Sequence, residues 1–179
     1  MDREQALEAL KLRVENPEHL KHSFAVEAVM RELARLFHED AEQWGLAGLV
    51  HNIDVERINK NTGMMSGDIL EGLDFDETIV YAVRSHNSNS SYARRRRIDK
   101  ALYCSDSVCK LIMACVKTLP SNNLKNTDKT LFLKCYYDKN FVPDIIRDQI
   151  AACSELELDL ESFIELSINA LKEISGRLE

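Results

Sequence analysis

Apolar residues return every three or four positions along nearly all of the 179-residue chain. This spacing is typical of amphipathic helices, and no run of alternating apolar and polar residues is long enough to indicate a strand. The sequence also contains only six Gly and three Pro, the residues that interrupt helices most strongly. We therefore predict an all-α fold.

The expected helices are separated by short polar segments. They lie near residues 3–15, 17–38, 41–53, 65–72, 76–86, 98–117, 127–137, 144–154 and 160–177. The best-marked start is Asn16-Pro17-Glu18, which combines an N-cap, a first-turn proline and an early acid. No internal repeat or change of composition marks a second domain. We expect one compact helical bundle over residues 1–179, with a core at about 17–117 and C-terminal helices at about 127–177.

Charge and hydropathy limit the expected partners and location. The chain has 23 basic and 30 acidic residues, and its formal net charge of −7 repels nucleic-acid backbones and anionic lipid at long range. The longest apolar run, around residues 108–116, is shorter than the ~20 residues that a membrane span needs. We therefore expect neither nucleic acid nor a membrane as a partner. The segment Met1-Asp2-Arg3-Glu4-Gln5 has mixed charge and no apolar stretch typical of a secretory signal, so we expect a cytoplasmic protein.

The five cysteines form an odd set without C-x-x-C spacing. In a chain without an export signal, this pattern favours thiols that are reduced and chemically quiet. We expect that state for Cys104, Cys109, Cys115, Cys135 and Cys153.

Three polar residues lie on otherwise apolar helix faces. His22 is one turn before the apolar stripe that begins at Val26, His51 directly follows an apolar helix, and Asp106 lies within an apolar stripe. A buried, ionised carboxylate persists only when it is paired, strongly hydrogen-bonded or bound to a metal. Two histidines and an aspartate from three helices form a ligand set that suits a divalent transition metal.

The same residues also have a purely structural interpretation. A single inward histidine such as His22 is more often a hydrogen-bonded core residue than a ligand. The segment His51-Asn52-Ile53-Asp54 can form a cluster of capping and hydrogen bonds at the end of its helix. Because residues far apart in sequence need not meet, spacing alone leaves both interpretations open.

Four blocks of sequence carry the polar residues of interest. They are Leu20-Lys21-His22-Ser23-Phe24-Ala25-Val26-Glu27-Ala28, Trp44-Gly45-Leu46-Ala47-Gly48-Leu49-Val50-His51-Asn52-Ile53-Asp54, Arg84-Ser85-His86-Asn87 and Asp99-Lys100-Ala101-Leu102-Tyr103-Cys104-Ser105-Asp106. In this order the blocks resemble the HD-domain superfamily of metal-dependent phosphohydrolases, all-α proteins whose signature is one His, a His-Asp pair and a later Asp. The resemblance covers most of the chain. It implies that His22, His51, Asn52 and Asp106 bind one divalent ion, and these ligand types do not distinguish Mn, Co, Ni, Fe, Mg and Zn.

The chain departs from the superfamily pattern at two positions. Asn52 stands where the pair has Asp, which removes one negative charge, although an amide oxygen can still bind a hard cation. Changes even outside the ligand set weaken metal binding or activity by about 10–100-fold, so this one should have at least that effect. Asp54 is not an obvious replacement, because two residues along a helix rotate the side chain by about 200°. Thr62 precedes Gly63 where related proteins often carry His, which removes a second metal or substrate contact.

The resemblance implies hydrolysis of a small phosphorylated compound such as a nucleotide. The ion would bind a phosphate oxygen and activate a water that Asp54 or Glu56 orients. His86 would donate to phosphate or to the leaving oxygen, and a helix-end hydrogen bond is its alternative role. Arg94 and Arg97, in the basic run before the Asp106 helix, would attract phosphate; the alternative is a solvated helix start.

Three functions follow from these patterns. The first is an HD-type, divalent-metal-dependent phosphohydrolase. The second is a weak or inactive HD-like protein that binds a ligand or partner without turnover, and Asn52 is the residue that separates the two. The third is an all-α interaction protein whose inward polar residues satisfy one another. We rank the first above the second because His22, His51, His86 and Asp106 are all present.

Overall fold

The computed structural model of the chain describes residues 1–56, 66–87, 90–119, 123–125, 127–141 and 143–178. The helices are α1 (Arg3–Lys11), α2 (Pro17–Leu36), α3 (Ala41–Val50), α4 (Ser66–Gly72), α5 (Glu77–Ser85), α6 (Arg97–Lys117), α7 (Lys129–Tyr137), α8 (Asp144–Ala151), the 3₁₀ helix η2 (Ala152–Leu156), α9 (Leu160–Glu173) and α10 (Ser175–Leu178). All regular secondary structure in these residues is helical, which confirms the predicted all-α fold. Within the same residues, no helix is both long and apolar enough to cross a bilayer.

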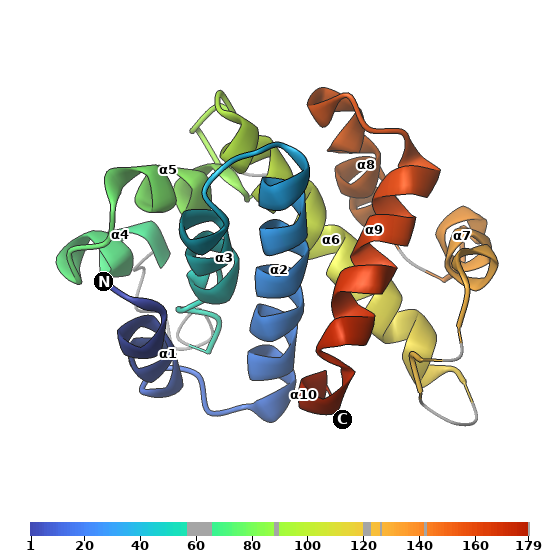
Figure 1. Cartoon of the computed structure of the whole chain (residues 1–179), viewed down its shortest axis with the longest axis horizontal. Coiled ribbons are helices and arrows are strands. Elements are labelled where there is room, and N and C mark those ends of the chain that lie inside the picture. Colours follow the sequence, from blue (N-terminus) through green and yellow to red (C-terminus); the bar gives the residue numbers. More distant parts are fainter. Residues whose placement is uncertain (57–65, 88–89, 120–122, 126, 142, 179) are drawn as a thin grey trace.

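Helix α2 lies in the middle of the bundle (Figure 1). It packs against α3 on one side and α9 on the other, and α6 runs diagonally across them. Helix α5 contacts both α3 and α6, and α7 and α8 also pack on α6. One cluster of buried apolar side chains, including Met30, Leu49, Leu102 and Phe163, joins α2, α3, α6 and α9.

Local capping sets both ends of the central helix α2. The Asn16 side chain caps the first turn and Pro17 is the first helical residue, as the sequence predicts. At the other end, His38 has a φ of 57° and the N–H of Glu39 donates to the carbonyl of Ala34 at 2.8 Å. This left-handed closure ends the helix slightly before the predicted boundary.

A buried carboxylate ties the first three helices together. Glu27 on α2 is 5% exposed, and its Oε1 accepts hydrogen bonds from Arg3 of α1 at 2.6 Å and from Arg31 at 3.0 Å. Arg31 also donates to Glu42 on α3 at 2.7 Å. Because an unpaired buried carboxylate is strongly unfavourable, these arginines allow α1, α2 and α3 to pack around it.

The backbones of α2 and α3 approach closely at Gly48. A Cβ atom at this position would lie 2.8 Å from the carbonyl oxygen of Val26 and 2.9 Å from the Cα of Glu27. Only glycine fits such a contact without moving one helix. The close approach brings the C-terminal end of α3 next to α2.

Two of the five cysteines are paired. Cys115 on α6 and Cys135 on α7 form a disulfide with their Cα atoms 6.5 Å apart, so the expectation of five reduced thiols is wrong for this pair. The pair has no C-x-x-C spacing; it forms because α7 packs back onto α6. Cys104, Cys109 and Cys153 are buried free thiols, and burial raises the pKa of each, which makes them poor nucleophiles.

Candidate metal centre

Three helices bring the predicted ligands together. His22 lies in the second turn of α2, His51 is the C-cap of α3, and Asp106 lies in the middle of α6. One potential ligand atom from each residue lies within 4.8 Å of the other two. The convergence that sequence spacing left open is therefore present in the structure.

The Asp106 Oδ1 atom is the centre of this cluster. His22 Nε2 donates to it at 2.8 Å, and His51 Nε2 lies 3.3 Å away. The His51 ring is fully buried, and its Nδ1 donates to the carbonyl of Gly48 at 2.8 Å. Burial lowers the pKa of His51 and outweighs the opposing effect of Asp106. At neutral pH the His51 ring is therefore uncharged, with its proton on Nδ1 and its Nε2 lone pair toward Asp106.

The geometry and the donor set fit a divalent ion. His51 Nε2 and Asp106 Oδ1 are both acceptors, so a cation between them would remove an unfavourable contact of lone pairs. Ligand atoms that share an ion at about 2.0–2.2 Å lie about 3 Å from each other. The two separations from Asp106 Oδ1 are 2.8 and 3.3 Å, and all three ligand atoms lie within 4.8 Å of one another. The bond from His51 Nδ1 to a backbone carbonyl is the kind that orients metal-binding histidines. An ion would take the place of the His22 Nε2 proton, which now forms the hydrogen bond to Asp106.

Sequence reasoning missed Lys110, which also contacts this cluster. Its Nζ lies 2.7 Å from Asp106 Oδ2, one turn further along α6. Burial acts to raise the pKa of Asp106, but the hydrogen bond from His22 and the charge of Lys110 hold that pKa well below its usual range. The carboxylate is therefore ionised, with one oxygen toward the histidines and the other toward lysine. The i,i+4 spacing of Asp106 and Lys110 was the signal that could have found this pair.

Asn52, predicted as a ligand, contacts the cluster through its amide nitrogen. Its Nδ2 donates to His51 Nε2 at 2.8 Å. In this orientation the amide satisfies the histidine and presents no oxygen to an ion. A half-turn of the amide would present Oδ1 instead, so the ligand role requires this hydrogen bond to break.

His86 lies next to His51, at the C-cap of α5. The two ring centroids are 5.4 Å apart. His86 Nδ1 donates to the carbonyl of Val83 at 2.6 Å, which is the helix-end hydrogen bond considered above. Burial, followed by the effect of His51, lowers the pKa of His86 to about 4. Since the neutral ring carries its proton on Nδ1, the geometry favours Nε2 as a proton acceptor rather than the expected donor.

The two acids expected to orient water make structural contacts in this conformation. Helix α3 ends at Val50, before its predicted boundary, and the chain turns through residues 51–56. Asp54 is buried and accepts a hydrogen bond from the Ser66 hydroxyl. Glu56 accepts from two backbone N–H groups at the start of α2, at 2.9 and 2.7 Å. A role for either acid in catalysis stays a prediction.

The two arginines expected to bind phosphate are both paired. Arg94 donates to Glu155 at 2.7 Å, and its guanidinium lies 3.8 Å from the centroid of the Tyr103 ring. Arg97 donates to Glu39 at 3.0 Å. These contacts hold the start of α6 against its neighbours, so a phosphate would have to compete with them. The phosphate-binding role of Arg94 and Arg97 stays a prediction.

Comparison with protein-family models, curated proteins and solved structures found no match for this chain. The fold and the site define an all-α protein with a candidate metal centre, and the likeness to the HD-domain superfamily rests on the sequence blocks alone. Thr62, Gly63 and the expected polar loop at 59–63 lie outside the described residues.

Proposed function

We propose that the chain is an HD-type, divalent-metal-dependent phosphohydrolase that acts on a small phosphorylated compound. The observation that carries the proposal is the convergence of His22, His51 and Asp106, whose potential ligand atoms lie within 4.8 Å of one another. The four sequence blocks support the same function, because these three residues occupy ligand positions of the superfamily signature.

The charge balance of the site favours an anionic substrate. Asp106 and Lys110 carry opposite charges 2.7 Å apart and largely neutralise each other. Because Asn52 is neutral, a divalent ion would leave about two positive charges at the site. A phosphate monoester carries about −1.5 to −2 at neutral pH and would balance them. The Lys110 side chain is 44% exposed, so its Nζ can contact the same phosphate from solvent.

Each residue of the cluster then has a defined role. His22, His51 and Asp106 hold the ion, which when bound supplies a Lewis acid and lowers the pKa of a water toward about 7. His86 is uncharged at neutral pH and accepts a proton at Nε2. The hydrogen bonds from His51 to Gly48 and from His86 to Val83 fix the orientation of both rings.

Metal binding and hydrolysis are best tested together on the natural protein and an Asn52→Asp variant. We expect the natural protein to bind Mn²⁺, Co²⁺ or Ni²⁺ and to hydrolyse at least one member of a phosphate-ester panel. The variant restores the missing carboxylate and should bind metal about 10–100-fold more tightly. Titration calorimetry measures the affinity, and phosphate release measures the activity.

Asn140→Asp is the matched control, because it adds the same charge at an exposed turn after α7. Its metal affinity should equal that of the natural protein. His22→Ala should abolish both metal binding and hydrolysis. If neither the natural protein nor the Asn52→Asp variant binds any of these ions, both proposals, the metal centre and the phosphohydrolase activity, are wrong.

A second function is favoured by Asn52 and Lys110. The amide of Asn52 already satisfies His51 Nε2, and the ammonium of Lys110 already satisfies Asp106 Oδ2. Under this second function, the chain binds a phosphorylated ligand or a partner at this site without turnover. A natural protein that is metal-free and inert, with an Asn52→Asp variant that gains both properties, would support this second function.

A further inference from the structure

Glu56 joins the turn that follows α3 to the start of α2. Its Oε1 atom accepts hydrogen bonds from the backbone N–H groups of Glu15 at 2.9 Å and of Asn16 at 2.7 Å. The same oxygen lies 3.4 Å from Nδ1 of His19, in the first turn of α2. One carboxylate thus holds together two segments that are 37–41 residues apart in the sequence.

Both of the joined segments carry residues of the proposed metal centre. His22 lies in the second turn of α2, and the turn at residues 51–56 begins with His51 and Asn52. The backbone N–H of Val55 donates to the carbonyl of Asn52 at 3.1 Å, so this turn is short and closed. A contact that fixes the far end of the turn therefore also limits where the Asn52 amide lies beside His51.

The partners of the Glu56 carboxylate are backbone groups that favour its charged form. The N–H of Asn16, followed by that of Glu15, lowers the pKa of Glu56. The carboxylate is therefore ionised at neutral pH, and charge-assisted hydrogen bonds of this kind are stronger than neutral ones. Glu56 does not belong to the group of described residues whose ligand atoms could share an ion. Its link with the metal centre is indirect, through the segments that it joins.

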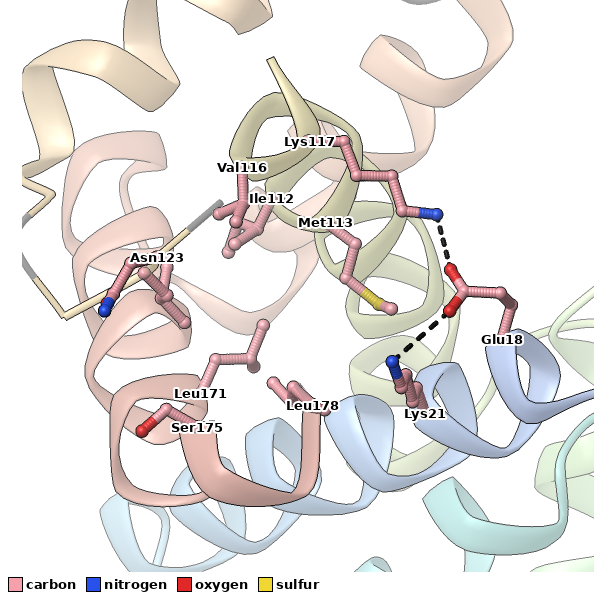
Figure 2. A pocket seen from close by; sticks show the side chains of 11 residues that line it. Glu18, Lys21, Ile112, Met113, Val116, Lys117, Asn123, Leu171, Ser175 and Leu178 are labelled. Carbon is pink, nitrogen blue, oxygen red and sulfur yellow. Dashed lines mark hydrogen bonds and ion pairs between the residues drawn. The ribbon is translucent and has the colours of Figure 1, made fainter. Parts of the chain in front are cut away.

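A second carboxylate contacts the start of α2 from another side. Figure 2 shows Lys21 and Lys117 both pointing toward Glu18, and ion pairs join Glu18 to each of them. These pairs link α2 to the end of α6 and do not involve the turn at 51–56. The Glu18 side chain is 47% exposed, and exposed ion pairs contribute little to stability. Glu18 is therefore a natural comparison for Glu56.

We propose that Glu56 is a positioning residue of the metal centre, which fixes the turn at 51–56 against the start of α2 and so places His51 and Asn52 relative to His22. The effect on an ion rests on the proposed function, whereas the effect on the two histidines does not. The contacts of Glu56 require an oxygen acceptor at the end of a side chain of this length, so glutamine can replace glutamate. A catalytic role in orienting water requires the negative charge instead.

Nuclear magnetic resonance of the full chain in EDTA tests the positioning without a metal. The rings of His22 and His51 have centroids 5.3 Å apart, close enough for a nuclear Overhauser effect between their protons. Glu56→Ala and Glu56→Asp remove or shorten the side chain, so this effect should weaken and the His51 ring signals should shift. Glu56→Gln keeps both length and acceptor and should retain the natural spectrum. Unchanged ring signals in Glu56→Ala and Glu56→Asp would overturn the proposal.

Glu18→Ala is the matched control, because it removes a carboxylate from the same turn of α2 without touching residues 51–56. Its Overhauser effect between His22 and His51 should equal that of the natural protein. Circular dichroism shows whether each variant is folded. If Glu56→Ala is unfolded, Glu56→Asp decides the outcome, because it keeps the charge and loses only the reach. An equal weakening in Glu18→Ala would show that Glu56 has no special role.

Metal titration and phosphate release complete the test. Glu56→Ala and Glu56→Asp should bind Mn²⁺ or Co²⁺ about tenfold more weakly than the natural protein, as for other residues that orient ligands. Glu56→Gln should keep both affinity and hydrolysis. A loss of hydrolysis of about 100-fold or more in Glu56→Gln would assign the carboxylate to catalysis and contradict the positioning role. A natural protein that binds no metal would refute the proposed function alone, since the measurements in EDTA still decide the role of Glu56.

Discussion

Asp106 pairs with one cation, Lys110, and would share its charge with a second if an ion bound at the proposed metal centre. In the structure, its Oδ2 pairs with Lys110 at 2.7 Å, while its Oδ1 faces His22 and His51. Lys110 lies one helical turn beyond Asp106, so its charge would oppose metal binding even when the lysine stays paired. At the proposed metal centre, Lys110 would therefore weaken metal binding without being a ligand itself.

Replacing that lysine should strengthen metal binding. Lys110→Gln removes one positive charge close to the ion, and we expect Mn²⁺ or Co²⁺ to bind about threefold to tenfold more tightly. Titration calorimetry measures the change. Lys100→Gln is the control on the same helix, because Lys100 Nζ lies 3.4 Å from the carbonyl of Glu155 and away from the cluster. Equal affinity in the two variants would show that Lys110 does not oppose the ion.

Helical period was enough to identify the inward positions of His22 and Asp106, because the period alone decides which face a residue occupies. It was not enough for Asn52, whose amide orientation depends on the neighbouring imidazole. It also failed to show that Glu56 binds the backbone just before α2, because that contact joins segments 40 residues apart. Side chains that lie beyond a helix end are placed by tertiary contacts, which the local pattern does not contain.

The close contact between α2 and α3 requires a residue without a side chain at position 48. In Gly48→Ala, the new methyl group would meet the backbone of α2 at 2.8–2.9 Å, so α3 must move away. We expect a loss of about 1–3 kcal/mol in the free energy of unfolding, measured by chemical denaturation. Metal binding should weaken as well, because His51 caps α3 and donates to the carbonyl of residue 48.

Gly72→Ala is the matched control for this substitution. A Cβ atom at Gly72, the last residue of α4, would meet nothing within 4 Å. This variant should be as stable as the natural protein or slightly more stable. If Gly48→Ala were equally stable, the close approach of α2 and α3 would not matter for folding.

Most helix positions could be predicted because caps and apolar stripes are local signals. The cap of α2 at Asn16 is the clearest case. The early end of α3 at Val50 carried no such signal, because the apolar pattern continues to Ile53, which is fully buried. The disulfide between Cys115 and Cys135 was missed for a related reason: the packing of α7 on α6, and not sequence spacing, brings these cysteines together.

The folded chain as a whole should lose stability in acid. Burial lowers the pKa of His51, and lowers that of His86 to about 4, whereas both histidines in the unfolded chain have pKa values near 6.5. Between about pH 6.5 and pH 4 the unfolded chain therefore binds more protons, and stability falls as the pH falls. Asp106, with a lowered pKa, adds a further loss below its unfolded pKa of about 3.9.

Chemical denaturation at pH 7 and pH 5, in EDTA, measures this dependence. We expect the lowered pKa of His86 to reduce the free energy of unfolding by about 1–2 kcal/mol over this interval, and the lowered pKa of His51 to reduce it further. His86→Gln should show a clearly smaller fall. His38→Asn changes an exposed histidine and should keep the natural dependence, because asparagine tolerates the positive φ at that position. Stability that stays constant down to pH 5 would contradict the lowered pKa values.

The caps at His51 and His86 have an electrostatic consequence for the whole site. Helices α3 and α5 both end there, with ring centroids 5.4 Å apart, so the carbonyl ends of two helices converge on one point. Each helix C-terminus carries the equivalent of about half a negative charge. Together they supply about the charge of one carboxylate, which is what Asn52 lacks relative to aspartate. The aligned peptide dipoles thus make this end of the bundle favourable to a cation even though position 52 is neutral.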